Sequence, residues 1–383
     1  MPDEPGAGPD PRQPEVIELA SVPGFVVFDL PGAPVCAGGT RLAPDISVAE
    51  VALLARAMTF KFAALGEQVG GAKAGLAGDL ADRTAKAGLM ARYCAEIRPL
   101  VDTGRFLTGP DMGTCEEDFA PLRERRAPPA AIQAVIGGVP FEDVLTGFGV
   151  VVAAEAALRA RRAGGPAGGA GSGAGRGWAG RSVAIEGFGK VGGGVAREVA
   201  SRGGLVVAIS TVAGCIADPA GLSVERLLEL RQAHGDDCIT RYGLPVEPPD
   251  RLFTGVAADV VVPGARPGVL GARAARSLPA SVRIIAPAAN VPYTAAGAEI
   301  LHQRGIVALP DFVCNAGAVI GYRSARGATP QQVLADVGER ITGIIREALD
   351  HQDGPLAGAC ALAVTFLRGW WGEPPGLPFA PPG

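Results

Sequence analysis

The sequence predicts an α/β protein built from two domains, and three observations carry this prediction. The chain has 383 residues, of which 48% are hydrophobic and 19% charged, so it is globular and long enough for two cores. Short apolar runs typical of strands alternate with helical stretches. In the second half, a Gly-x-Gly-x-x-Gly motif at 187–192 separates a strand-like run from a helical stretch. This context is typical of a Rossmann-type dinucleotide-binding domain.

Composition excludes several classes of function. A net charge of −4 gives no electrostatic reason to expect nucleic acid as a partner. The sequence has no uninterrupted apolar run of about 18 residues, so we expect no membrane span. The first fifteen residues lack the basic start and apolar core of a signal peptide. The seven cysteines include no CxxC pair, and the three histidines show no ligand spacing. We therefore expect a cytoplasmic protein with reduced thiols and no metal site.

The first half begins with residues 1–20, which we expect to be a disordered leader. Strands are predicted over 24–30 and 34–42, the second interrupted by paired glycines. Ser47 is a plausible N-cap, and Glu50 three residues later completes a capping box for a helix that reaches the region of Lys61. A second helix is expected over 80–97, ending before Pro99. A short strand from residue 105 then leads into a tight turn that contains Asp111.

Lys61 and Lys73 lie twelve residues apart among Ala, Phe, Leu, Val and Gly. Two ammonium groups in an apolar cleft would lower each other's proton affinity. One could then act as a general base while the other stays charged and holds a carboxylate. Spacing alone favours the simpler interpretation of two snorkelling lysines at a helix end. Asp111, taken alone, likewise favours an Asx-turn.

The second half is predicted to open with a helix over 144–162, followed by a flexible Gly-rich insert at 163–180. Strands over 181–186 and 205–210 enclose the helix 193–202 in a βαβ unit. Thr211 follows where an acid that binds the ribose of NAD would stand, so the choice between NAD and NADP stays open. Further strands are expected over 258–262, 282–286 and 305–310, helices over 294–304 and 331–348, and a loose tail after Trp371. The expected domains are 21–145 and 146–325, with a C-terminal helical segment and tail at 326–383.

With these motifs in order, the chain resembles the glutamate/leucine/phenylalanine/valine dehydrogenase family over residues 24–325. The matching stretches are Ala37-Gly-Gly-Thr-Arg41, Met58-Thr-Phe-Lys61, Gly70-Gly-Ala-Lys73, Pro110-Asp-Met-Gly-Thr114, Gly187-Phe-Gly-Lys-Val-Gly192, Pro287-Ala-Ala-Asn290 and Pro310-Asp-Phe-Val-Cys-Asn-Ala-Gly317. The resemblance implies a substrate domain and a Rossmann-type domain with a cleft between them. It also implies an NAD- or NADP-dependent L-amino acid dehydrogenase that forms a 2-oxo acid and ammonium, assembled as a homo-oligomer.

The resemblance also implies roles for single residues. Lys61 would bind the substrate α-carboxylate, helped by the backbone N–H groups of Gly38 and Gly39. Lys73 would be the general base that activates water, and Asp111 would shuttle protons to and from the amino group. Asn315 would lie where substrate and nicotinamide meet. The residues implied in cofactor binding are Thr146, Gly187, Phe188, Gly189, Lys190, Val191, Gly192, Thr211, Ala288 and Asn290.

Substrate choice follows from the residues expected to line the side-chain pocket. Ala37 stands where glutamate-specific members have a lysine, and Tyr322 stands in place of a pocket serine. With Gly109 and Val319, these residues favour an aliphatic or aromatic amino acid, with leucine, valine, phenylalanine and tryptophan unresolved. Two alternatives stay open. One is a nicotinamide-binding homologue that acts as a regulatory or partner subunit, motivated by Thr211 and the shortened N-terminus. The other is a Rossmann oxidoreductase of the malic or methylene-folate type.

Overall fold

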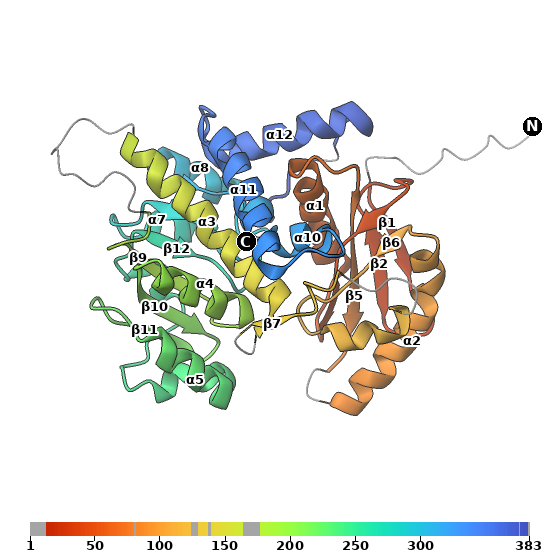
Figure 1. Ribbon diagram of the computed structural model, residues 1–383, viewed down its shortest axis with the longest axis horizontal. Helices are drawn as coiled ribbons and strands as arrows, with labels where there is room; N and C mark the ends of the chain where they lie inside the picture. Colours follow the sequence, from red (N-terminus) through yellow and green to blue (C-terminus); the bar gives the residue numbers. More distant parts are fainter. Residues whose placement is uncertain are drawn as a thin grey trace, which may run out of the picture. The chain divides into compact units, whose positions relative to one another are not determined.

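The computed structural model describes residues 13–79, 82–123, 129–136, 139–163, 177–374 and 376–381 (Figure 1). It divides into two compact units. The first is Met1–Ala127 with Leu362–Pro378, and the second is Pro128–Ala361 with Phe379–Gly383. The domain boundary expected at 145/146 falls inside helix α3 (Phe141–Ala163), which the structure keeps whole within the second unit. Residues 1–12 of the expected leader and most of the expected Gly-rich insert lie outside the described residues.

The first unit contains a mixed sheet of order β1-β2-β5-β3-β6, in which β4 also pairs with β5. Its strands are β1 (Glu15–Glu18), β2 (Gly24–Phe28), β3 (Cys36–Ala37), β4 (Thr40–Ala43), β5 (Gly70–Ala77) and β6 (Phe106–Leu107). Its helices are α1 (Val48–Ala64), α2 (Arg83–Asp102) and the short 3-10 helix η1 (Glu116–Leu122). Strand β1 pairs antiparallel with β2, so the structure differs here from the expected disordered leader.

Strand β5 is the centre of this sheet, although its sequence, GGAKAGLA, has no β-branched residue. Strands β3 and β4 follow one another along one side of β5, pairing with Gly70–Gly71 and with 74–77 respectively. Between them Gly38 and Gly39 interrupt the ladder opposite Ala72 and Lys73. A Cβ atom on Gly38 would lie 1.7 Å from the Ala72 carbonyl oxygen, so only glycine fits there.

Helix α1 packs on β5 because glycines alternate with larger residues along the strand. A Cβ atom on Gly71 would lie 1.9 Å from the Ala55 carbonyl oxygen of α1, and one on Gly75 would lie 2.8 Å from Val51. Alternate residues of a strand point to one face. Lys73, between these two glycines, therefore faces α1.

The expected N-cap of α1 is confirmed without its capping box, and the expected end of α2 differs in the structure. Ser47 caps α1 by accepting the Glu50 N–H at 3.2 Å, but the Glu50 carboxylate binds Arg41 and does not complete the capping box. Helix α2 continues through Pro99 to Asp102. Proline at this position still permits the following turn, in which Thr103 donates to the Pro99 carbonyl oxygen.

The second unit contains a sheet of order β11-β10-β9-β12-β13-β14, parallel except for β11. Its strands are β9 (Ser182–Glu186), β10 (Leu205–Thr211), β11 (Gly214–Ala217), β12 (Val260–Val262), β13 (Ile284–Ile285) and β14 (Val307–Ala308), with a separate hairpin of β7 (Val135–Ile136) and β8 (Val139–Pro140). The chain runs outward from β9 to β10 in one direction and from β12 to β14 in the other. Right-handed crossovers then put helices on opposite faces, with a switch point between β9 and β12.

The helices of the second unit include four that the sequence predicts and others that it does not. They are α3, α4 (Lys190–Ser201), α5 (Val224–His234), η2 (Gly235–Arg241), α6 (Arg251–Thr254), α7 (Ala272–Ser277), α8 (Ala295–Gln303), α9 (Asp311–Cys314), α10 (Gly317–Tyr322), α11 (Pro330–Leu349) and α12 (Gly354–Trp370), whose last residues belong to the first unit. Helix α3 packs on α4 and α11. The described part of the expected loose tail is anchored at Ala380, which is buried and donates its N–H to the Tyr293 carbonyl oxygen.

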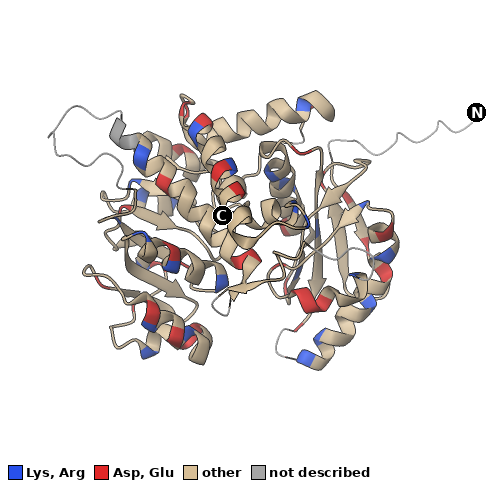
Figure 2. Ribbon diagram, viewed as in Figure 1, with Lys and Arg blue, Asp and Glu red and all other residues tan. Residues whose placement is uncertain are grey.

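Figure 2 shows blue and red residues mixed along outer helices such as α2 and α5, whereas the strands are almost entirely tan. Among the described residues, no helix is both long and apolar enough to cross a bilayer.

Candidate active site

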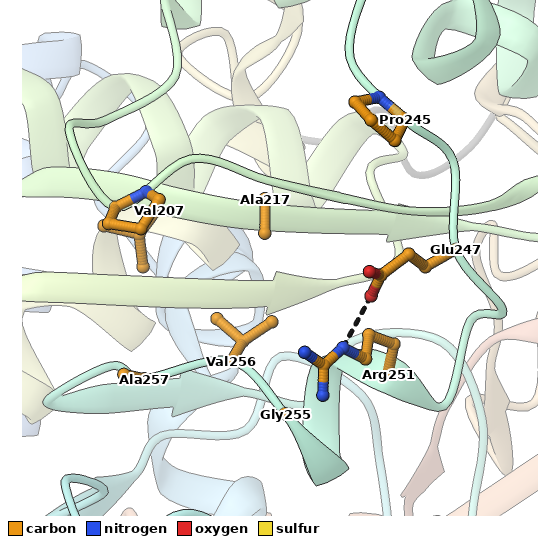
Figure 3. Close-up of a pocket in the computed structure, with 9 residues that line it drawn as sticks. Val207, Ala217, Pro245, Glu247, Arg251, Gly255, Val256 and Ala257 are labelled. Atoms are coloured by element: carbon orange, nitrogen blue, oxygen red, sulfur yellow. Dashed lines mark hydrogen bonds and ion pairs between the residues drawn. The ribbon is translucent and has the colours of Figure 1, made fainter.

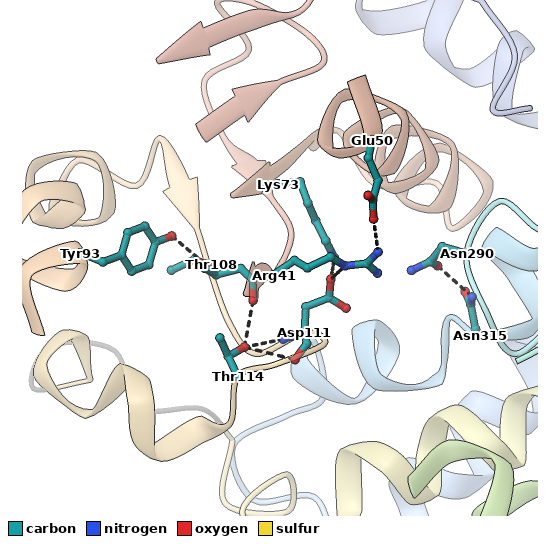
Figure 4. A network of polar contacts seen from close by, with 10 residues as sticks. Arg41, Glu50, Lys73, Tyr93, Thr108, Asp111, Thr114, Asn290 and Asn315 are labelled. Atoms are coloured by element: carbon teal, nitrogen blue, oxygen red, sulfur yellow. Dashed lines mark hydrogen bonds and ion pairs between the residues drawn. The ribbon is translucent and has the colours of Figure 1, made fainter. Parts of the chain in front are cut away.

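Three charged side chains of the first unit meet at one carboxylate oxygen (Figure 4). Lys73 Nζ, from β5, lies 3.1 Å from Asp111 Oδ2, and Arg41 Nε, from β4, lies 3.0 Å from the same atom. Lys73 is 4% exposed and Arg41 7% exposed. The turn that carries Asp111 is tied to the sheet by Thr114, whose hydroxyl accepts the Asp111 N–H at 2.9 Å and donates to the Thr40 carbonyl oxygen at 2.9 Å.

The proton affinities of this pair are strongly perturbed. Burial lowers the pKa of Lys73; the attraction of Asp111 offsets part of this effect, and repulsion from Arg41 adds to it. Burial alone would raise the pKa of Asp111, but the charges of Lys73 and Arg41 hold it well below its usual range. The site therefore favours an ionised carboxylate beside an amine that loses its proton readily.

Lys61 lies in the last turn of α1 and is 5% exposed. Met58, one turn earlier on the same face, has its Cγ 3.4 Å from where a Cβ atom on Gly38 would be. This end of α1 thus lies over the glycine break. The Gly38 N–H already donates to the Leu107 carbonyl oxygen at 3.1 Å, whereas the Gly39 N–H forms no hydrogen bond within the described part of the chain.

Gly39 lies directly against the turn that carries Asp111. A Cβ atom on Gly39 would lie 2.6 Å from the Pro110 carbonyl oxygen and 3.0 Å from Asp111 Cβ. The Gly39 N–H, Lys73 and Asp111 therefore belong to one small region. Ala37, two residues earlier on β3, is 8% exposed and brings no charge to it.

Gly109 is partly buried, and the first atom that a Cβ there would approach is Arg123 Nη2, at 3.8 Å. Arg123 binds Glu116 through Nε at 2.6 Å. Among the described residues, nothing accepts a hydrogen bond from its buried Nη2.

The glycine motif of the second unit forms a cradle at the switch point. Gly187 has φ +79°, and a Cβ there would lie 2.9 Å from the carbonyl oxygen of Gly264, which follows β12. A Cβ on Gly192 would lie 2.0 Å from the Gly187 carbonyl oxygen, but a Cβ on Gly189 would meet nothing within 4 Å. Gly189 is the N-cap of α4 and brings no capping side chain. Open space beside an uncapped helix N-terminus fits the pyrophosphate of a dinucleotide.

The other residues of the motif divide into buried and exposed positions. Phe188 is 1% exposed and packs in the core, while its N–H donates to the Ser210 carbonyl oxygen. Lys190 is exposed, with Nζ 3.8 Å from Asp143 Oδ2, and Val191 is partly buried. Thr211 is 7% exposed, and its hydroxyl donates to the Asp236 carbonyl oxygen at 2.8 Å.

A second loop of this unit is held by hydrogen bonds from the segment after β14. Asn315 Nδ2 donates to Asn290 Oδ1 at 2.9 Å and to the Ala288 carbonyl oxygen at 3.2 Å. Asp311 Oδ2 accepts the Val291 N–H at 2.7 Å. Val291 has φ +52°, a strained conformation for a β-branched residue, and its side chain is 1% exposed. The Asp311 bond and the burial of Val291 offset this strain and fix the position of Asn290 beside it.

Thr146 and Tyr322 are both connected to Glu142 at the start of α3. The Thr146 hydroxyl donates to the Glu142 carbonyl oxygen at 2.9 Å, so its lone pairs are available to a donor. The Tyr322 hydroxyl lies 2.8 Å from Glu142 Oε2. Val319, one turn before Tyr322 on α10, is partly buried.

Sequence reasoning missed three buried charged groups in these regions. Arg41 and Asp311 stood in matched motifs without a role, and Glu186 closed a predicted strand. Glu186 is 7% exposed, and its carboxylate accepts the N–H groups of Gly264 and Ala265 at 3.2 and 3.3 Å. A charged residue inside an apolar run was the available signal, because such residues are rarely buried without a partner.

A hollow of about 300 Å³ lies elsewhere in the second unit (Figure 3). It is bordered by Val207, Ala217 and Val256 and by the ion pair of Arg251 with Glu247, 2.5 Å apart. Val256 precedes β12, so the hollow belongs to the amino-terminal half of the parallel strands. Dinucleotides bind at the carboxyl ends, and we do not assign this hollow to the cofactor. The described residues include no group of three or more His, Cys, Asp or Glu that could hold a metal ion.

Comparisons with known proteins agree with this geometry. Residues 29–125 match the Glu/Leu/Phe/Val dehydrogenase dimerisation domain, and residues 137–325 match the Glutamate/Leucine/Phenylalanine/Valine dehydrogenase domain. Glutamate dehydrogenase A2 of Halobacterium salinarum is 31% identical over 353 residues, covering 86% of this chain and 80% of that protein.

Solved structures share the fold. Hetero-hexameric glutamate dehydrogenase from Thermus thermophilus, in its Leu-bound form, has a TM-score of 0.76 at 24% identity, covering 94% of this chain and 89% of that one. L-tryptophan dehydrogenase from Nostoc punctiforme has a TM-score of 0.60 at 22% identity, covering 93% and 96%. The predicted two-domain α/β fold is confirmed. The chain thus belongs to the glutamate/leucine/phenylalanine/valine dehydrogenase family and is an amino acid dehydrogenase that uses NAD or NADP.

Proposed function

We propose that this enzyme catalyses the reversible oxidative deamination of an apolar L-amino acid to its 2-oxo acid and ammonium. The observation that carries the proposal is the buried contact between Lys73 and Asp111, 3.1 Å apart, beside the Gly39 N–H. An amine whose pKa is lowered, an ionised carboxylate and a backbone donor are what deamination needs within one small region.

In this mechanism Lys61 holds the substrate α-carboxylate, and the Gly39 N–H assists it. Gly38 contributes its lack of a side chain and no hydrogen-bond donor, because its N–H already donates to the Leu107 carbonyl oxygen. Asp111 accepts a proton from the substrate ammonium group, which leaves the neutral amine required for loss of hydride. When bound, NAD(P)⁺ would supply the acceptor for the hydride that leaves the α-carbon. Lys73 then takes a proton from the water that attacks the imine carbon. Asp111 returns its proton to the amino group, and ammonia leaves with the hydroxyl proton, as ammonium, while the 2-oxo acid forms.

The residues of the second unit have proposed roles toward the cofactor. Gly187, Gly189 and Gly192 with the N-terminus of α4 receive the pyrophosphate, and Thr146 and Asn290 contact the carboxamide of the nicotinamide. Asn315 orients Asn290 through their 2.9 Å hydrogen bond. Remaining members of the cofactor set are Phe188, Lys190, Val191, Thr211 and Ala288. Because the Thr211 O–H donates to the Asp236 carbonyl oxygen, this side chain could only accept a hydrogen bond from a ribose hydroxyl, and the choice between NAD and NADP stays open.

An apolar substrate is favoured by Ala37, which brings no charge to pair with a side-chain carboxylate, and by the proposed lining residues Gly109 and Val319. One observation favours a second candidate, an acidic amino acid. Arg123 Nη2 lies 3.8 Å from the Cβ position of Gly109 and has no acceptor among the described residues. The glutamate dehydrogenase A2 relative points in the same direction.

A panel of L-amino acids, assayed by NADH and NADPH absorbance and then in reverse with 2-oxo acids and ammonium, tests the proposal. We expect the highest kcat/KM for leucine, valine, phenylalanine or tryptophan. A preference for glutamate, abolished in Arg123→Met, would select the second candidate. Turnover of none of these amino acids would contradict both.

We further infer a homo-oligomer located in the cytoplasm. The match of residues 29–125 to a dimerisation domain supports the first inference, and the seven free cysteines support the second. Sedimentation of the purified protein tests the oligomeric state.

A further inference from the structure

Asp111 has two cations on one oxygen, although a single cation would neutralise it. Arg41 Nε lies 3.0 Å and Lys73 Nζ 3.1 Å from Oδ2. Arg41 also reaches Glu50 Oε1 with Nη1 at 2.6 Å, so its guanidinium bridges the Asp111 turn and the first turn of α1. Arginine keeps its charge at every physiological pH, whereas a buried lysine loses its proton readily. The two cations are therefore not equivalent.

The charged groups around the pair come from each element packed against it. Strand β4 brings Arg41, α1 brings Glu50 and Lys61, and β5 and the 110–114 turn bring Lys73 and Asp111. At the end of β2, Asp29 is bound by Arg56 of α1 at 2.5 Å and by Thr59 at 2.6 Å, so its charge is matched separately.

The contact between Arg41 and Asp111 matters most when Lys73 is neutral. With Arg41 in place, Asp111 still has a counter-ion after Lys73 loses its proton. Without Arg41, loss of that proton would leave a buried carboxylate unpaired, which is energetically unfavourable. Lys73 would then keep its proton to higher pH.

We propose that Arg41 is a positioning residue whose guanidinium is the permanent counter-ion of Asp111 and thereby frees Lys73 to act as a neutral amine. The proposal rests on the roles of Lys73 and Asp111 in the proposed function. The directions of the pKa shifts agree with it, since Arg41 lowers the pKa of both groups.

The test measures the titration of Lys73 directly in the unliganded enzyme. Competitive labelling with acetic anhydride across a pH series, read by peptide mass spectrometry, gives the midpoint at which the amine becomes reactive. We expect Arg41→Gln to raise this midpoint by about one pH unit or more, and Arg41→Lys, which keeps a cation, to remain near the wild-type value. In Arg41→Gln, the acid limb of the pH profile of kcat/KM should also move to higher pH.

Arg56→Gln is the matched control. It removes a partly buried arginine from another ion pair of the same unit, so it should lower stability without moving the Lys73 midpoint. Should Arg41→Gln fold poorly, Glu50→Gln carries the test, because it retains the charge of Arg41. Its midpoint should stay at or below the wild-type value.

An unchanged or lower midpoint in Arg41→Gln, or a raised one in Glu50→Gln, would overturn the role of Arg41. These results do not depend on turnover. If the enzyme oxidises no amino acid, the proposed function fails. The titration still decides whether Arg41 lowers the pH at which Lys73 loses its proton.

Discussion

At the scale of single residues, the environment of Lys73 follows from its neighbours along β5. Gly71 and Gly75 allow α1 to approach closely and exclude water from the amine between them. The result is a lysine that is 4% exposed and held by Asp111. Such burial is uncommon for lysine and is characteristic of catalytic bases.

Replacing Lys73 by alanine should lower kcat by about 10³-fold or more, because the proton acceptor is lost. Affinity for NADH or NADPH, measured by fluorescence titration, should stay within about twofold of the wild type. Lys86→Ala is a suitable control, since Lys86 binds Asp118 at 2.8 Å in the same unit without a proposed role. Near-normal turnover of Lys73→Ala would remove this lysine from the mechanism.

Glu186 gives a pH-dependent prediction at the same scale. Burial raises the pKa of Glu186 above its ordinary value of 4.5, and the N–H groups of Ala265 and Gly264 oppose this only in part. The folded state therefore disfavours the charged form. Below pH 4.5 both folded and unfolded chains are protonated and nothing is lost, whereas stability falls as pH rises through the native pKa.

Glu186→Gln, which keeps both acceptor bonds without the charge, should therefore have a higher urea midpoint than the wild type at pH 8. The difference should narrow toward pH 4. Glu229→Gln, on an exposed position of α5, should show neither effect. A variant less stable than the wild type at pH 8 would show that the charge itself stabilises the loop after β12.

At the scale of elements, the turn from β9 into α4 separates two uses of glycine. Gly192 is needed for packing, because a Cβ there would lie 2.0 Å from the Gly187 carbonyl oxygen. Gly189 faces open space, so its lack of a side chain has no packing reason within the fold. A bound ligand that needs the space beside Gly189 would therefore explain the glycine at this position, whereas packing explains the glycine at position 192.

We expect Gly189→Ala to leave the free energy of unfolding within about 0.5 kcal/mol of the wild type and to weaken NAD(P)H binding about tenfold or more, since each tenfold loss corresponds to about 1.4 kcal/mol. Gly192→Ala should instead cost about 1–3 kcal/mol through overpacking. Urea unfolding and fluorescence titration measure the two quantities. Unchanged affinity in Gly189→Ala would move the pyrophosphate away from this turn.

At the scale of the whole molecule, the first unit contains the proposed proton-transfer groups and the second unit contains the dinucleotide motif. Hydrogen exchange with NAD(P)H at about one hundred times its Kd should add about 2.7 kcal/mol of protection where exchange requires unfolding of the second unit. The effect should centre on 187–192 and 287–291. Protection absent from 187–192 would contradict the proposed cofactor site.

Much of this architecture could be predicted from the sequence, and the misses have physical causes. Motifs that act through their own backbone, such as 187–192, can be predicted because the residues that form the sequence motif also form the structure. Strand β5 was missed because its glycines and alanines lack strand propensity, and only the packing of α1 explains them. The role of Arg41 was missed because its contact with Asp111 joins residues 70 apart.

The length of helix α1 determines the distance and relative orientation of two charged groups near the proposed site. Glu50 at its start holds Arg41, and Lys61 lies eleven residues, about 16 Å, further along. Inserting one residue between them would rotate Lys61 by about 100° relative to Glu50. This would turn the ammonium that we propose binds the substrate carboxylate away, while the contacts of Arg41 stayed intact. Attempts to redesign the substrate range should for this reason vary side chains such as Ala37 and keep the length of α1 constant.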